Sequence, residues 1–173
     1  MTIEYCNFIQ CPRLEKFYGK FASDDGLCVI CGNKLIAYAS NCGHKKYIIP
    51  NNVTEICDGA FYNCHNIIEI HIPNTVTKIG GQVWGNCTSL QSITFPENVY
   101  LIKNKCFVGC DNLINVYLMP LNPPTNDSRY IGQPNFFDTK KNDVTFYVSQ
   151  NVVNKYKAYW PQYADKIVGY DYE

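Results

Sequence analysis

A repeat of 23 residues constrains this chain more than any other feature of its sequence. Three prolines and three cysteines share that step in one register: Pro50, Pro73 and Pro96, then Cys64, Cys87 and Cys110. Eight columns of each unit stay apolar or small, as at Phe61, Trp84 and Phe107, while the columns between them vary freely. Because a unit this short cannot bury its own apolar face, the repeat predicts a stack in which each unit closes the core of its neighbour.

Each unit carries an alternating apolar segment that is typical of a half-buried strand. These segments cover residues 67–72, 90–95 and 113–118. Stacked units would place them in a parallel ladder with about 4.8 Å between strands. A second, shorter strand is expected over residues 53–56 and its equivalents, and residues 58–64 would turn around the opposite side of the unit. The sequence therefore predicts a strand-rich α/β repeat solenoid.

The repeated columns resemble the BspA-like leucine-rich repeat, a bacterial and protist variety with 23-residue units. The first unit carries the pattern in the following residues: Val53-Thr54-Glu55-Ile56, Ala60-Phe61, Cys64, Ile67 and Ile70-His71-Ile72-Pro73. Units two and three depart from it at Val83-Trp84, Cys106-Phe107 and Met119. The resemblance covers residues 50–118 closely, and it implies a right-handed leucine-rich repeat array.

The segments on both sides of the repeats are expected to be caps, because an open solenoid end exposes apolar side chains and strand edges. Residues 8–17 align with half a unit. Two strand-like stretches, residues 27–30 and 34–39, flank Gly32-Asn33 as in a β-hairpin. We therefore divide the chain into an N-terminal half-repeat with a hairpin, three repeats, and a C-terminal cap: residues 1–49, 50–118 and 119–173.

The C-terminal cap is expected to combine a loop, a strand, a helix and a second strand. These elements would cover residues 120–134, 144–148, 151–160 and 167–170, in that order. Ser149 is the expected N-cap of the helix, and Pro161 would end it. The helix would cover the last repeat with four side chains: Val152, Tyr156, Tyr159 and Trp160.

Charge and hydropathy exclude several classes of protein. Fifteen Lys and Arg balance fifteen Asp and Glu, so the net charge is zero and no basic patch favours nucleic acid as a partner. No apolar run approaches the ~18–20 residues that a membrane span needs. The residues after Met1 do not have the pattern of a signal peptide.

The cysteines raise the question of disulfide, metal or thiol chemistry. We interpret the column of Cys64, Cys87 and Cys110 as inward packing, because cysteine is among the most buried residue types and three thiols cannot pair completely. Cys28 and Cys31 have C-x-x-C spacing, and a zinc site would need further ligands from Cys6, Cys11, Cys42 and His44. That motif lies in a strand-like run rather than at a helix N-terminus, so zinc binding is the weakest hypothesis. We predict no metal and no cofactor.

No catalytic constellation is visible in the sequence. The three histidines, His44, His65 and His71, fall on separate loops and units, and no nucleophile accompanies them in a known signature. We interpret the carboxylates, Asp58 among them, as solvated groups on turns and faces. We therefore predict that the protein is not an enzyme.

The outward strand positions remain as the candidate ligand-binding surface. They are Lys46, Glu69, His71, Ser92, Thr94, Asn115 and Tyr117. A rigid ladder presents such variable side chains at fixed spacing, so we expect a binding module for a protein or glycan partner. The family resemblance implies adhesion and a place at the cell surface or outside the cell. The alternatives are a structural spacer within a larger repeat protein and, more weakly, the zinc-binding N-terminal cysteine cluster.

Overall fold

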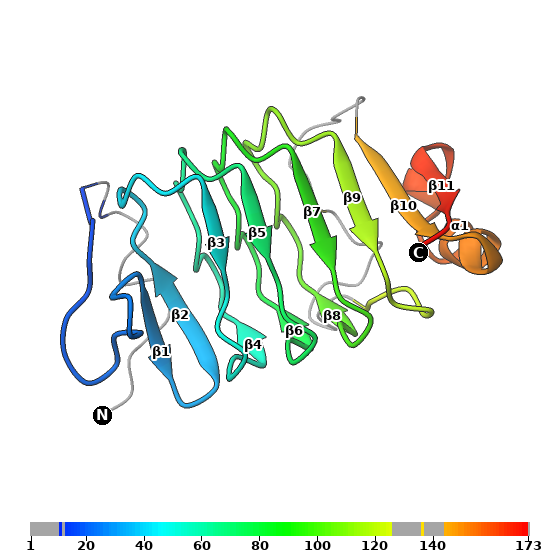
Figure 1. The fold of residues 1–173 in the computed structure, drawn as a ribbon. Coiled ribbons are helices and arrows are strands. Elements are labelled where there is room, and N and C mark those ends of the chain that lie inside the picture. The colour runs from blue at the N-terminus through cyan, green and yellow to red at the C-terminus, as the bar shows by residue number, and fades with distance from the viewer. Residues whose placement is uncertain (1–10, 12, 126–135, 137–143, 173) are drawn as a thin grey trace.

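The computed structural model describes residues 11, 13–125, 136 and 144–172, and its elements stack along one axis (Figure 1). The strands before and within the three repeats are β1 (Cys28–Cys31), β2 (Lys34–Tyr38), β3 (Lys46–Ile48), β4 (Glu55–Ile56), β5 (Glu69–His71), β6 (Lys78–Ile79), β7 (Ser92–Phe95), β8 (Leu101–Ile102) and β9 (Asn115–Leu118). The C-terminal part contains β10 (Thr145–Ser149), the 3₁₀ helix η1 (Gln150–Val152), α1 (Val153–Tyr159), the 3₁₀ helix η2 (Pro161–Lys166) and β11 (Ile167–Tyr170). No helix in these residues combines the length and the hydropathy that a bilayer crossing requires.

Each repeat contributes one longer and one shorter strand, as the sequence predicts. Parallel pairing joins residues one period apart, for example Ile93 with Val116 and Lys78 with Leu101. The longer strands begin two residues later than the alternating pattern indicates. The reason is that the first apolar residue of each segment still belongs to the preceding turn, where the Ile67 amide donates to the Cys64 carbonyl oxygen at 3.3 Å.

The longer strands form two separate sheets. β3 pairs with β5 in what we call the two-stranded sheet, and β7, β9, β10 and β11 form the four-stranded sheet. In the part of the chain that the structure describes, no strand pairing joins β5 to β7, although the two lie side by side (Figure 1). The shorter strands β4, β6 and β8 continue from the hairpin as one further sheet, in the order β1-β2-β4-β6-β8.

The apolar columns that recur in each unit of the repeat fill the core between these sheets. Cys64, Cys87 and Cys110 are all buried, which confirms the inward cysteine column. The Cys87 thiol donates to the carbonyl oxygen of Phe61 at 3.1 Å, and the Cys110 thiol donates to that of Trp84 at 2.9 Å. These hydrogen bonds connect each unit to the one before it. No disulfide joins any two cysteines of the described residues.

The N-terminal strands of the expected hairpin are present. β1 runs antiparallel to β2 around the turn at Gly32, whose φ of 62° lies in the left-handed region that glycine tolerates. β2 then pairs in parallel with β4 of the first repeat. Of the half-repeat expected over residues 8–17, residues 8–10 and 12 lie outside the described residues.

The C-terminal part agrees with the sequence in its elements but not in two details. The first detail concerns Ser149, which is the N-cap residue of the helical segment that begins at Gln150, but whose hydroxyl donates to the Asn151 side-chain oxygen and makes no capping bond to a helix amide. Tyr159 was expected in the core but is 46% exposed. Tyr156 and Trp160, one helical turn apart, are the residues that face inward. Residues 126–134 of the expected loop lie outside the described residues.

Candidate binding surface on the longer strands

The seven candidate residues project from the outer face of the longer strands in two columns. Strand register aligns Lys46 with Glu69, and Ser92 with Asn115, in one column. The other column contains His71, Thr94 and Tyr117, preceded by Ile48. Four of the seven residues are exposed, namely Lys46, Glu69, His71 and Thr94, and three are half-buried, namely Ser92, Asn115 and Tyr117.

On the two-stranded sheet the surface is charged. The Lys46 ammonium lies 2.6 Å from a carboxylate oxygen of Glu69, and these side chains are 74% and 56% exposed. An ion pair this exposed contributes little to stability, but it neutralises both charges locally. Beside it, Ile48 is 71% exposed and aligned with His71. This end of the surface therefore combines a neutralised ion pair with one exposed apolar side chain.

On the four-stranded sheet the surface is aromatic and uncharged. The ring of Tyr117 stacks on that of Tyr147, with centroids 4.7 Å apart and an interplanar angle of 17°. Tyr170 meets both rings edge to face, at 5.5 Å and 5.7 Å. Tyr172 lies 5.0 Å from Tyr170 and donates its phenol hydrogen to the Tyr147 carbonyl oxygen at 2.9 Å. We call these four residues the tyrosine cluster.

Of the tyrosine cluster, the sequence predicts only Tyr117 as a residue of the candidate binding surface. Tyr147 pairs with Tyr117 in the strand register, yet it follows it by 30 residues rather than by one period, so a search for the period does not find it. Tyr147 could have been found from the alternation of apolar and polar residues in 144–148, which places it on the outer face of a strand. The location of Tyr170 and Tyr172 in the cluster depends on the pairing of β11 with β10. That pairing is a tertiary contact that the sequence pattern does not predict.

The environment raises the pKa of two phenols of the cluster, those of Tyr117 and Tyr172. Partial desolvation raises the pKa of Tyr117, and the neighbouring phenols of Tyr147 and Tyr170 raise it further. Burial, as the main cause, raises the pKa of Tyr172 to about 12. The Tyr117 and Tyr172 phenols are therefore uncharged at neutral pH.

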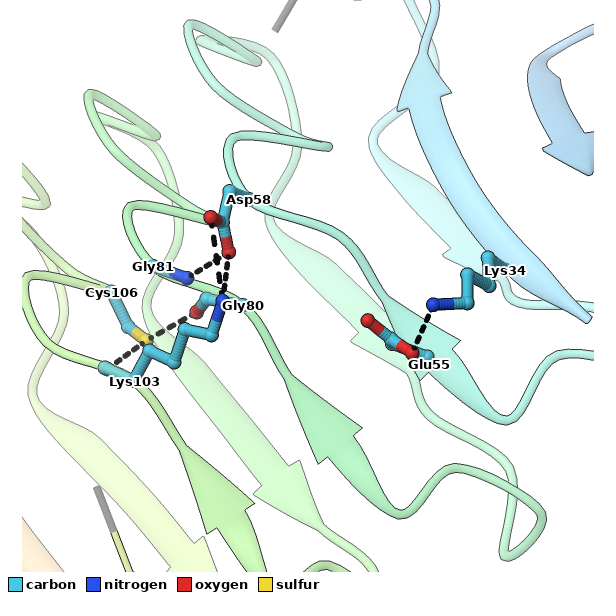
Figure 2. A network of polar contacts seen from close by, with 7 residues as sticks. All are labelled: Lys34, Glu55, Asp58, Gly80, Gly81, Lys103 and Cys106. Atoms are coloured by element: carbon cyan, nitrogen blue, oxygen red, sulfur yellow. Dashed lines mark hydrogen bonds and ion pairs between the residues drawn. The ribbon is translucent and has the colours of Figure 1, made fainter. Parts of the chain in front are cut away.

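The face formed by the shorter strands holds the units together. The Lys34 ammonium lies 2.9 Å from a Glu55 carboxylate oxygen (Figure 2). Asp58 accepts a hydrogen bond from the Gly81 amide at 2.9 Å and pairs with the Lys103 ammonium at 3.1 Å, so that one carboxylate links three successive units. The interpretation of Asp58 as a merely solvated group is therefore wrong.

Figure 2 also shows how closely the units approach one another at Gly80. A Cβ atom on Gly80 would lie 2.5 Å from the Asp58 amide nitrogen, so that position requires glycine. The Cys106 thiol donates to the Gly80 carbonyl oxygen at 3.2 Å and connects the third unit to the second. Because these groups contact one another, they connect successive units of the chain and are not available to a ligand.

The N-terminal cysteines do not form a common site in the described residues. Cys28 packs into the main core and Cys31 packs against a second, smaller cluster, because residues three apart on a strand face opposite sides. The Cys28 thiol donates to the Tyr47 phenol oxygen at 3.1 Å, and burial raises its pKa, which opposes thiolate chemistry. No three His, Cys, Asp or Glu side chains of the described residues gather as metal ligands. Cys6 lies outside these residues.

Comparison with known proteins agrees with the repeat geometry. The sequence profile of the BspA-type leucine-rich repeat region matches residues 36–160 in six copies. The chain belongs to the BspA-type leucine-rich repeat family. The match extends beyond the three units that the period reveals, into both flanking segments. No match is found among the curated proteins.

Two solved structures of this type resemble the chain. A leucine-rich repeat protein from Eubacterium ventriosum superposes with a TM-score of 0.66 at 18% sequence identity, over 86% of this chain and 39% of that protein. The pneumococcal vaccine antigen PcpA superposes with a TM-score of 0.53 at 15% identity, over 91% of this chain and 48% of the antigen. At these identities the likeness concerns the fold, and this chain spans less than half of either protein.

Proposed function

We propose that this BspA-type chain is a non-enzymatic recognition module that binds a protein or glycan partner through the outer face of its longer strands. The observation that carries the proposal is the contrast between the two outer faces. The short-strand face uses Glu55, Asp58 and Lys103 to connect its own units. The long-strand face presents the candidate residues at fixed spacing, and exposed members such as Thr94 and His71 are directed away from the core. A rigid ladder of this kind suits recognition.

The proposal also covers the organisation of the chain. The three repeats, residues 50–118, form a right-handed array. Residues 1–49 close its N-terminal end, and residues 119–173 close its C-terminal end. We place the protein at the cell surface or outside the cell as an adhesion module, in keeping with its family and with the resemblance to a vaccine antigen.

The test compares binding by matched variants of the two faces. The probes are an array of defined glycans and a panel of purified extracellular-matrix and serum proteins. The long-strand variant is His71→Glu with Thr94→Arg, which adds charge and bulk at two exposed positions without removing core atoms. The control is Tyr100→Ala, which removes a ring that is 54% exposed on the short-strand face. Thermal unfolding of all three proteins verifies that they fold equally well.

Loss of binding in the long-strand variant alone supports the proposal. Equal binding by that variant and by the wild type overturns it, because the ligand would then lie elsewhere. If the wild type binds no probe on either panel, the result favours the spacer alternative, in which the strands only connect neighbouring parts of a larger repeat protein.

A further inference from the structure

The geometry points to an uncharged carbohydrate as the ligand, bound on the four-stranded sheet at the tyrosine cluster. This inference rests on the proposed function, because it takes the long-strand face as the binding face and names the chemistry of its partner. It also narrows the site from seven residues along the whole face to the sheet that begins at β7. Three kinds of observation support it: the composition of the strands, the arrangement of the rings, and the position of the charges.

The four-stranded sheet contains no charged side chain. Its strands read SITF, NVYL, TFYVS and IVGY, whereas β3 and β5 of the two-stranded sheet read KYI and EIH. The outward positions are almost all hydroxyl, phenol or amide groups: Ser92, Thr94, Asn115, Tyr117, Thr145, Tyr147, Ser149 and Tyr170. Val168, 39% exposed, is the one apolar residue among them. Groups of this kind both donate and accept hydrogen bonds, as sugar hydroxyls do.

The rings of the tyrosine cluster form a preorganised contact surface. Tyr117 and Tyr147 fix each other by stacking, and Tyr170 closes against both while it remains 42% exposed. The face of an aromatic ring carries negative charge density and attracts the weakly positive C–H bonds of a sugar ring. Because the ring contacts already exist in the free protein, little side-chain entropy is lost when a ligand settles on them. Aromatic rings bordered by hydroxyl and amide groups therefore match a pyranose chemically.

The charges argue against an acidic ligand. No cation on these four strands is available for a carboxylate or a sulfate, and the Lys46 ammonium on the neighbouring sheet is already paired with Glu69. A charged group placed here would lose its hydration without gaining a partner. A neutral carbohydrate has no charged group and therefore avoids this loss of hydration.

The experiment uses the full chain and polysaccharides of known charge. The neutral probes are mixed-linkage β-glucan, xylan and galactomannan, and the acidic probe is polygalacturonate. Affinity gel electrophoresis and isothermal titration measure binding by the wild type, Tyr170→Ala, Thr94→Lys and the control Tyr100→Ala. Tyr170→Ala removes an exposed ring, and Thr94→Lys adds a charge on the same face without removing any core contact. The control removes an exposed tyrosine from the other face.

We expect the wild type to bind at least one neutral polysaccharide, with an affinity that sodium chloride does not weaken. Tyr170→Ala and Thr94→Lys should each weaken this binding by about fivefold or more, while Tyr100→Ala binds like the wild type. Binding only to polygalacturonate, or neutral binding that both strand-face variants retain, overturns the inference. The same variants, tested on the protein panel above, distinguish failure of the carbohydrate assignment from failure of the proposed binding face. A protein ligand lost in Thr94→Lys overturns the carbohydrate assignment and keeps the proposed face, whereas no binding to any probe overturns both.

Discussion

The two sheets of the long-strand face pack on one continuous core but differ in the chemistry of their outward residues. Their inward residues are buried and apolar in both sheets, as Ile70 of β5 and Ile93 of β7 illustrate. Their outward residues change from an exposed ion pair on β3 and β5 to hydroxyl groups and tyrosines on β7 to β11. The change occurs where the strand pairing between β5 and β7 is interrupted. The inward residues thus form one common core, whereas the outward residues differ in chemistry between the two sheets.

The largest effect is expected when the C-terminal half of the four-stranded sheet is removed. Deletion of residues 144–173 takes away β10, β11 and α1, and it uncovers the buried side chains of β9, Val116 and Leu118. An uncapped solenoid end exposes apolar surface and an unpaired strand edge. We expect an insoluble chain or one without a cooperative thermal transition in circular dichroism. A cooperative melt of the truncated chain would show that the C-terminal segment is not needed as a cap.

A smaller change tests whether the two sheets unfold together although their strands do not pair. Phe146 on β10 is buried against Trp160 and Tyr163, and it belongs to the same core cluster as Tyr47 on β3. We expect Phe146→Ala to lower the free energy of unfolding by about 3–5 kcal/mol. Because the core is continuous, hydrogen exchange in β3 should accelerate as much as in β9.

The control for Phe146→Ala is a variant with a similar ring removed outside the core. Tyr100→Ala serves this purpose, because its ring is 54% exposed and it should change stability little. If Phe146→Ala speeds exchange in β9 and leaves β3 unaffected, the interruption between β5 and β7 divides the molecule into two independently unfolding parts.

The contribution of Tyr172 to the stability of the tyrosine cluster is expected to depend on pH. Its folded pKa is raised to about 12, above the value of about 10 for a free tyrosine. Below pH 10 the phenol is protonated in both states, whereas between pH 10 and 12 it ionises first in the unfolded chain. This stabilisation is therefore complete below pH 10 and is lost as the pH rises through the folded pKa.

Tyr172→Phe isolates that contribution. At pH 8 the variant should be less stable by about 0.5–1.5 kcal/mol, because it lacks the hydrogen bond to the Tyr147 carbonyl oxygen. Urea unfolding at half-unit steps from pH 9 to 11.5 should show a shallower loss of stability in the variant than in the wild type. Parallel curves for the two proteins would mean that the Tyr172 phenol titrates alike in the folded and unfolded chains.

The interior of the fold was predictable because its signal is periodic. Columns such as Cys64, Cys87 and Cys110 identify themselves by their spacing, and their burial follows from stacking. The candidate surface was only partly predictable. Tyr147 and Tyr170 lie outside the period, and their proximity to Tyr117 results from the parallel addition of β10 and β11 to β9. The ion pair of Asp58 with Lys103 spans two periods and depends on the turns that bring the groups together.

The smallest effect is expected at the charged end of the face. The double variant Lys46→Gln and Glu69→Gln removes the 2.6 Å ion pair and keeps the length of the Glu69 side chain. Because both groups are largely exposed, the change in the free energy of unfolding should stay below about 0.5 kcal/mol, and 0.5 M sodium chloride should remove even that difference. Chemical unfolding at low and high salt measures it. The variant should also bind a neutral polysaccharide like the wild type, since that ligand is assigned to the other sheet. A loss of polysaccharide binding without a loss of stability would place the charged sheet inside the binding site and contradict the division of the face proposed above.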